Sequence, residues 1–137
     1  MAGAFVYVVD DDPQVRESMT FLLEAYELQC LTFPDGQSLL DAVDALGPGC
    51  ILLDLCMPRR TGLDVQTELA RRGSRLPVIA MTAGANPETA RRTLAMGAVD
   101  LLEKPFAEDA LLSALRAGFA QLSGTGERAG VVQRVRP

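Results

Sequence analysis

Histidine is absent from this sequence of 137 residues. Its absence excludes Ser-His-Asp catalysis, histidine-ligated metals and the most common general base. Lysine is scarce as well, because Lys104 is the only lysine beside twelve arginines. A chain that places arginine at nearly every cationic position and keeps one lysine draws attention to that lysine.

Cysteine is also sparse and shows no pairing pattern. The three cysteines, Cys30, Cys50 and Cys56, are an odd number and include no C-x-x-C pair. The spacing therefore indicates neither a disulfide framework nor a zinc site. Because Cys30 and Cys50 lie in or beside strand-like segments, we expect them to be small core residues.

No apolar run approaches the length of a membrane span, and the N-terminus lacks the pattern of a signal peptide. We therefore expect a cytoplasmic protein with no membrane partner. The net charge of −5 argues against a surface that binds nucleic acid directly. The length fits one domain, and 48% hydrophobic residues suffice for its core.

Strand-like and helix-like segments alternate along the chain. The expected strands cover residues 4–9, 28–33, 50–54, 77–81 and 99–102. The expected helices cover residues 13–26, 35–46, 63–72, 86–96 and 107–122. Five strand–helix units with short connections predict one α/β domain over residues 1–122, with a doubly wound parallel sheet. Residues 123–137 are Gly-rich and polar without periodicity, which predicts a flexible tail.

Polar residues follow these strands directly. Asp10-Asp11-Asp12 follows the first strand, Asp54 ends the third, Thr82 follows the fourth and Lys104 follows the fifth. Any single aspartate there is equally well explained as a turn former. Ligands of open α/β sheets, however, bind beyond the carboxyl ends of the strands, so the fold would bring the whole set to one edge.

Such a set suits phosphoryl transfer. Close carboxylates repel each other by roughly 4 kcal/mol per pair at an effective dielectric of 20, so a cation must offset them. Oxygen ligands favour Mg²⁺, while Lys104 adds a positive charge and Thr82 a hydroxyl group. A carboxylate can serve as the nucleophile, and Asp54 is the candidate because it stands alone at the centre of the sheet.

Four segments resemble the signatures of one family: VVDDDPQVR (8–16), ILLDLCMPRRTGLD (51–64), VIAMTA (78–83) and GAVDLLEKPF (97–106). Together, in this order over about residues 5–122, they resemble the receiver domains of bacterial two-component response regulators. Their wording is most similar to FixJ-like receivers. The resemblance implies a flavodoxin-like sheet of order 2-1-3-4-5 with five helices.

The resemblance also implies roles for the polar residues. Asp54 would be the phosphoacceptor. Asp11 would bind Mg²⁺ directly, Asp10 would help to hold it through water, and the backbone carbonyl of Cys56 would complete the protein ligands. Asp12 would cap a helix.

Lys104 would pair with Asp54 and then with the phosphoryl group, which Thr82 would also bind. The Lys104–Pro105 bond is expected to be cis, which would aim the lysine. The phosphoryl donor would be a sensor histidine kinase or a histidine phosphotransfer protein. Phosphorylation would then alter the surface formed by the fourth helix, fifth strand and fifth helix, with homodimerisation as one outcome and a downstream output protein or domain as the partner.

Two positions depart from the family pattern or vary within it. Leu101 stands where the family usually has an aromatic switch residue; either it repacks beside Thr82 in the same way or the coupling is altered. Cys56 occupies a variable position that tends to tune the lifetime of the phosphoryl group.

Three functions remain to be separated. The chain is a stand-alone switch, the receiver half of a FixJ-like DNA-binding transcription regulator, or a small phosphatase. Residues 123–137 are too few for a DNA-binding domain. The phosphatase chemistry normally needs a second aspartate two residues after the nucleophile, where this chain has Cys56. We therefore expect a signalling protein that catalyses only its own phosphorylation and dephosphorylation.

Overall fold

The computed structural model describes residues 5–84 and 86–124. Its strands are β1 (Phe5–Val9), β2 (Gln29–Phe33), β3 (Gly49–Asp54), β4 (Val78–Thr82) and β5 (Asp100–Glu103). Its helices are α1 (Pro13–Ala25), α2 (Gly36–Ala42), α3 (Gly62–Arg71), α4 (Pro87–Ala95) and α5 (Glu108–Gly124), with a short 3₁₀ helix η1 (Val43–Ala45) after α2. All ten predicted elements are present.

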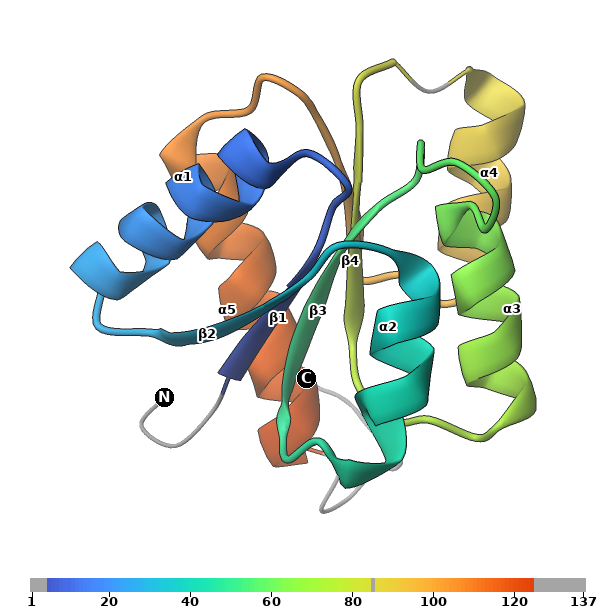
Figure 1. Cartoon of the computed structure of the whole chain (residues 1–137), viewed down its shortest axis with the longest axis horizontal. Coiled ribbons are helices and arrows are strands. Elements are labelled where there is room, and N and C mark those ends of the chain that lie inside the picture. The colour runs from blue at the N-terminus through green and yellow to red at the C-terminus, as the bar shows by residue number, and fades with distance from the viewer. Residues whose placement is uncertain (1–4, 85, 125–137) are drawn as a thin grey trace.

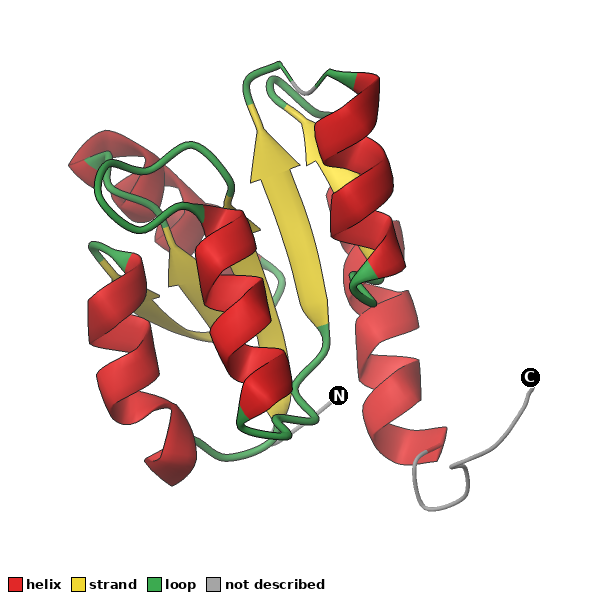
Figure 2. Ribbon diagram, turned by 90° about the vertical axis from the view of Figure 1, so that its right-hand side faces the viewer, coloured by secondary structure: helices red, strands yellow, loops and turns green. Residues whose placement is uncertain are grey.

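The five strands form one parallel sheet of order β2-β1-β3-β4-β5, which confirms the expected fold. Figures 1 and 2 show helices on both faces of this twisted sheet. Alternation along the strands builds two cores. Val6 and Val8 pack with residues of α1 and α5, whereas Tyr7 and Val9 pack with residues of α2 and α3.

The centre of the sheet is buried. Every residue of β3 is buried, because β1 and β4 flank the strand and helices cover both of its faces. This environment explains why the strand reads as a continuous apolar run instead of an alternating one. Asp54 ends this run, so its carboxylate projects from a strand whose residues are all buried.

Side-chain caps start the helices close to the carboxyl ends of the strands. Asp12 accepts a hydrogen bond from the Gln14 amide, which confirms its predicted role as the cap of α1. Thr61 and Asp64 form a reciprocal capping box at α3. These caps make the turns after β1 and β3 compact and keep their polar residues at one edge of the sheet.

The predicted helix over residues 35–46 is shorter in the structure. α2 ends at Ala42, and η1 tightens the last turn before Leu46 becomes extended. Pro48 disfavours helical backbone at the preceding Gly47, and the Tyr7 hydroxyl donates to the Gly47 carbonyl at 2.7 Å. The turn is thereby tied to the sheet before β3 begins.

α5 runs to Gly124, two residues past the predicted end at Leu122. Leu111, Leu115 and Phe119 bury its apolar stripe against the sheet. The rest of the predicted tail lies outside the described residues. Among the described helices, none is both long and apolar enough to cross a membrane.

Candidate functional site

The carboxyl ends of the strands bring the predicted polar residues together. Asp10 follows β1, Asp54 ends β3, Thr82 ends β4, and Lys104 follows β5. Carboxylate oxygens of Asp10, Asp11 and Asp54 all lie within 4.8 Å of one another. Asp11 and Asp54 are 43 positions apart along the chain (from 11 to 54). They come together because β1 and β3 are neighbours in the sheet.

Asp10 is the most tightly held member of the cluster. It is 0% exposed, and its Oδ2 receives a hydrogen bond from Lys104 Nζ at 2.8 Å. Its Oδ1 accepts from the Asp12 amide at 2.9 Å, and its backbone carbonyl accepts from Arg16 Nη1 at 2.7 Å. The role of Arg16 was not predicted from the sequence. Only its position, one turn into the helix that follows the aspartates, could have indicated this contact.

Asp54 is 4% exposed, and its Oδ1 accepts a hydrogen bond from the Cys56 amide at 3.1 Å. Lys104 Nζ lies 3.9 Å from the same oxygen. The lysine therefore stands between two carboxylates and is closer to Asp10 than to Asp54, the only partner that the sequence analysis named. The Lys104–Pro105 peptide bond is cis, as the resemblance implied.

Burial and charge act against each other in this cluster. Burial raises the pKa of Asp54, the Cys56 amide lowers it, and the nearby charges of Asp10 and Lys104 respectively raise and lower it, with a net upward shift. Burial lowers the pKa of Lys104, but its hydrogen bond to Asp10 and the surrounding carboxylates outweigh that effect and raise it.

The cluster has more negative than positive charge. Asp10, Asp11 and Asp54 face a single ammonium group, that of Lys104. The donor atoms are all oxygens, and one carboxylate, that of Asp11, is exposed to solvent. Such a donor set fits a small hard cation that keeps several waters, as Mg²⁺ does.

Two further side chains border the cluster. Thr82 is 1% exposed, and its Oγ1 accepts from the Gly84 amide at 3.3 Å. The exposed thiol of Cys56 lies 3.8 Å from the Thr82 hydroxyl. A hydroxyl and a thiol from two different strand ends therefore stand side by side next to the phosphoacceptor candidate.

Gly62 fixes the loop between β3 and α3. A Cβ atom at this position would lie 2.8 Å from the Asp54 carbonyl oxygen and 2.7 Å from the Leu55 Cα atom. The start of α3 thus packs directly on the backbone beside Asp54, and only glycine allows this approach. No local pattern in the sequence indicates this contact.

Leu101 lies on β5 opposite Ala80 and is partly exposed, while Thr82 pairs with Glu103. Strand alternation places Leu101 and Thr82 on the same face of the sheet, diagonal to each other. The geometry thus preserves the expected neighbourhood of the two positions with a leucine in place of an aromatic ring.

Comparison with known proteins decides the family. The model of the response regulator receiver domain matches residues 6–116. The chain belongs to this family. Among curated relatives, the transcriptional regulatory protein FixJ of Azorhizobium caulinodans is 39% identical over 90% of this chain and 58% of its own length. The transcriptional regulatory protein TdiR of Thauera aromatica is 37% identical over 84% of this receiver and 51% of its own length.

Solved structures agree with this assignment. FixJ-N matches the receiver with a TM-score of 0.81 and 26% identity, over 86% of this chain and 94% of its own. The response regulator StyR matches with a TM-score of 0.83 and 34% identity, over 93% of this chain and 64% of its own. The receiver thus spans about half to three fifths of the two curated relatives' lengths.

Proposed function

We propose that this FixJ-like receiver is a phosphorylation-dependent switch in which Asp54 accepts a phosphoryl group. The observation that carries the proposal is the buried Asp54 carboxylate, which lies beside two more carboxylates and 3.9 Å from the only lysine. The donor is the phosphohistidine of a sensor kinase or of a histidine phosphotransfer protein. The switch operates in the cytoplasm as part of a two-component system.

In the proposed reaction, an Asp54 oxygen attacks phosphorus while the bond between phosphorus and the donor imidazole breaks. The electron pair of that bond leaves with the imidazole, which takes up a proton. The Cys56 amide holds Asp54 Oδ1 at 3.1 Å and so orients the attacking carboxylate. Lys104 neutralises charge on the phosphoryl oxygens, and the Thr82 hydroxyl donates a hydrogen bond to one of them.

The residues present fit Mg²⁺. Asp11 would bind the ion directly, Asp10 would support it through water, and Asp54 and the backbone carbonyl of Cys56 would complete the protein ligands. When bound, Mg²⁺ neutralises charge and holds phosphoryl oxygens in place. Asp10 is already anchored by Lys104, Asp12 and Arg16, so this side of the proposed site is held firmly before any ligand binds.

Signal output would follow from the added charge. Phosphorylation adds about −1.5 to −2 charges, and Thr82 and Lys104 would turn toward them. The ends of β4 and β5 would move with these two residues and change the surface of α4, β5 and α5. A downstream protein or domain, or a second copy of the chain, would read this change, with Leu101 repacking as Thr82 moves.

The test is incubation of the protein with acetyl phosphate or a phosphorylated kinase in the presence of Mg²⁺. We expect native protein to gain a base-labile phosphate, and Asp54→Asn to gain none. Asp44→Asn, which removes an exposed carboxylate outside the cluster, is the matched control and should label normally. Equal labelling of the Asp54→Asn variant would disprove the assignment.

A second candidate function is the receiver half of a DNA-binding regulator. The observation that favours it is that the relatives named as transcriptional regulators extend well beyond the matched length. The mass of the natural polypeptide, together with DNA binding by the purified 137-residue chain, separates the candidates. A natural product of this length that does not bind DNA supports the stand-alone switch.

A further inference from the structure

The helix α4 is thinly attached to the rest of the fold. Among its nine residues, all of which the structure describes, only Thr93 is buried, whereas α3 buries four of its ten. Leu94, the large apolar residue of α4, is 47% exposed. Helices in proteins owe most of their stability to the packing of an apolar face, which α4 does not bury. A small shift of α4 therefore disturbs few packing contacts.

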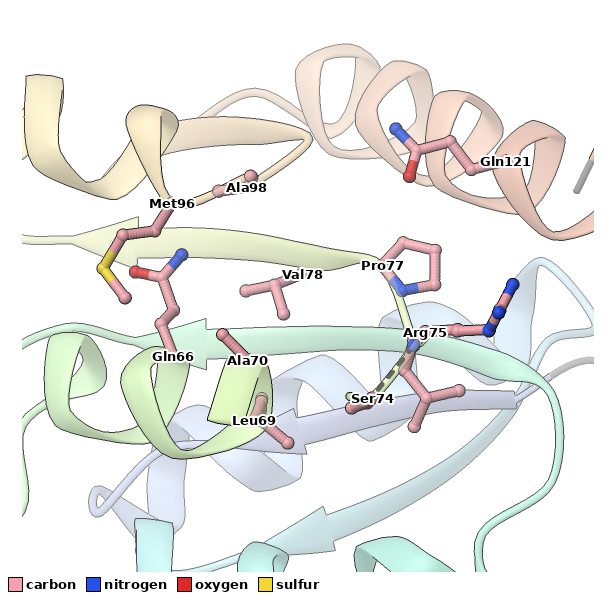
Figure 3. A pocket seen from close by; sticks show the side chains of 12 residues that line it. Gln66, Leu69, Ala70, Ser74, Arg75, Pro77, Val78, Met96, Ala98 and Gln121 are labelled. Atoms are coloured by element: carbon pink, nitrogen blue, oxygen red, sulfur yellow. Dashed lines mark hydrogen bonds between the residues drawn. The ribbon is translucent and has the colours of Figure 1, made fainter. Parts of the chain in front are cut away.

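The buried point of α4 is a polar contact with α3. Gln66 of α3 is 4% exposed, and its Nε2 donates to the Thr93 carbonyl at 3.2 Å. Figure 3 shows the Gln66 side chain extending from α3 toward the C-terminal end of α4. The same carbonyl accepts from the Ala98 amide at 3.4 Å, so Gln66 supports the hydrogen bonding that ends α4.

Two complementary atoms of this contact are unpaired. Gln66 Oε1 and Thr93 Oγ1 are both buried, and neither has a hydrogen-bond partner within the described part of the chain. Because a carbonyl can only accept, the bond from Gln66 Nε2 leaves Oε1 as an acceptor, and the Thr93 hydroxyl can donate. Buried polar atoms without a partner are costly and rare in native structures. A donor and an acceptor on two residues already in contact therefore indicate a second arrangement in which they pair.

Thr93 differs from two other helical threonines. Thr20 Oγ1 donates to the Arg16 carbonyl and Thr67 Oγ1 to the Leu63 carbonyl, each at 2.9 Å. This bond to the carbonyl four residues earlier is a common way for threonine to satisfy its hydroxyl group in a helix. The Thr93 hydroxyl forms no such bond with any described residue. Its donor is therefore available to α3.

A hollow beside this contact leaves room for the end of α4 to move. Its volume is about 220 Å³, and its lining includes Gln66, Met96 and Ala98 (Figure 3). Close-packed interfaces resist displacement, because a shift creates clashes on one side and voids on the other. The C-terminal end of α4 borders open space instead, so a shift that brings the Thr93 hydroxyl to Gln66 Oε1 meets little resistance.

The two helices are tied to different parts of the acidic cluster. α3 is fixed to the phosphoacceptor strand, since Gly62 at its start packs on the Asp54 backbone. α4 instead follows Thr82 along the chain. Displacement of Thr82 toward a phosphoryl group on Asp54 would therefore move α4 relative to α3. The contact between Gln66 and Thr93 spans the boundary where that movement occurs.

We propose that Gln66 and Thr93 form a two-position latch between α3 and α4. In the resting receiver, only Gln66 Nε2 and the Thr93 carbonyl are joined. In the phosphorylated receiver, α4 shifts so that the Thr93 hydroxyl also donates to Gln66 Oε1, and both buried atoms become paired. The added hydrogen bond stabilises the phosphorylated arrangement. The inference rests on the proposed phosphorylation of Asp54 and adds the contact that favours the switched position of α4.

The test measures how readily the full chain adopts the phosphorylated arrangement. Beryllofluoride, a stable analogue of the phosphoryl group, is titrated at fixed Mg²⁺ and followed by ¹H–¹⁵N NMR. Thr93→Val and Gln66→Leu nearly keep the size of each side chain and remove the hydroxyl or the amide. Each should raise the beryllofluoride concentration at half-conversion about threefold to tenfold, because each removes one hydrogen bond that only the switched state makes.

Stability separates the latch from a purely structural contact. Thr93→Val removes a hydroxyl that has no described partner in the resting receiver, so its Tm in EDTA without beryllofluoride should be unchanged or higher. A purely structural role would instead lower Tm and leave the midpoint of the titration unchanged. The double variant should shift that midpoint no further than either single variant, because both remove the same hydrogen bond.

Two more variants serve as controls. Thr93→Ser keeps the hydroxyl and should behave as the native protein does. Thr67→Val removes the hydroxyl of an exposed threonine on α3 and is the matched control, so its midpoint should equal the native one. A native midpoint in Thr93→Val would overturn the latch even if Gln66→Leu failed to fold.

The outcomes also distinguish the latch from the function on which it rests. Native midpoints in both single variants would overturn the latch but leave phosphorylation at Asp54 intact, as expected if a buried water pairs both atoms in either state. Shifts that add in the double variant would overturn it as well, because the two residues would then act independently. If the native protein does not respond to beryllofluoride, or if Asp54→Asn responds equally, the proposed function fails and the latch fails with it.

Discussion

Removing one charge from the acidic cluster should stabilise the metal-free receiver. The perturbation is Asp54→Asn, which keeps the shape of the side chain and the acceptor for the Cys56 amide. It removes a carboxylate whose oxygens lie within 4.8 Å of those of Asp10 and Asp11. At an effective dielectric of 20, each repulsion at that separation is about 3.5 kcal/mol.

The expected increase in the free energy of unfolding is smaller than the sum of these two repulsions. The attraction between Asp54 and Lys104 at 3.9 Å, about 4 kcal/mol on the same scale, is lost as well. Asp11 is exposed, so water screens its charge and weakens its repulsion with Asp54 further. We expect a net stabilisation of about 1–3 kcal/mol, or a rise in Tm of roughly 3–9 °C for a domain of this size.

The assay is thermal unfolding followed by circular dichroism, in EDTA and in a Mg²⁺ series. Without metal, Asp54→Asn should melt above the native protein. At a concentration of one hundred times its Kd, Mg²⁺ should stabilise the native protein by about 2.7 kcal/mol and the variant much less. The difference in Tm between the two proteins should therefore disappear as Mg²⁺ is added. Asp44→Asn should change Tm little in either condition.

Two results would refute this reasoning. If Asp54→Asn is no more stable than the native protein in EDTA, repulsion among the carboxylates does not dominate the cluster. If Mg²⁺ stabilises both proteins equally, Asp54 does not contribute to the cation site. Unchanged behaviour of Asp44→Asn is required for either conclusion.

Three further outcomes are expected. Gly62→Ala should lower the free energy of unfolding by about 1–3 kcal/mol in urea titration, because its Cβ would meet the Asp54 carbonyl; native-like stability would contradict this contact. Arg59→Gly should raise the free energy of unfolding by up to about 1 kcal/mol, because Arg59 has a φ of 67° that glycine adopts without strain; an unchanged or lower Tm would count against strain there. The Ser38 amide donates a hydrogen bond to Asp35 and lowers the pKa of its carboxyl group, so the stability that this cap contributes is present at neutral pH and is lost as pH falls through the lowered pKa. Asp35→Ala should therefore lower the free energy of unfolding by about 1 kcal/mol at pH 7 and by less in acid. An equal loss at both pH values would argue against the cap.

Much of the fold could be predicted because local signals agreed with one another. The continuous apolar run that ends at Asp54, the proline that opens α1 and the alternation of strands with amphipathic helices all point to a parallel sheet between helices. The predicted helix over residues 35–46 differs only at its end, where α2 stops at Ala42 and η1 continues to Ala45. The turn that follows is tied to the sheet by the hydrogen bond from the Tyr7 hydroxyl to the Gly47 carbonyl, which joins residues 40 positions apart. No local pattern carries that information.

The sequence also predicted which residues form the candidate site, but it did not predict which of them are in contact with each other. Each of Asp10, Asp54, Thr82 and Lys104 directly follows an apolar strand, so the rule for open α/β sheets placed them at one edge. Sequence order does not show that Lys104 lies 2.8 Å from Asp10 and 3.9 Å from Asp54. Arg16 was missed because its contact is to a backbone carbonyl, which every residue possesses.

The sequence by itself determined which residues meet, because strand ends are set by hydrophobic periodicity and parallel connections leave few topologies. The tertiary structure alone decided how they meet: which carboxylate holds the lysine, and that Gly62 packs on the Asp54 backbone. Distances and burial depend on how helices settle on the sheet. That packing sums many contacts between residues far apart in the chain, and no short segment encodes it.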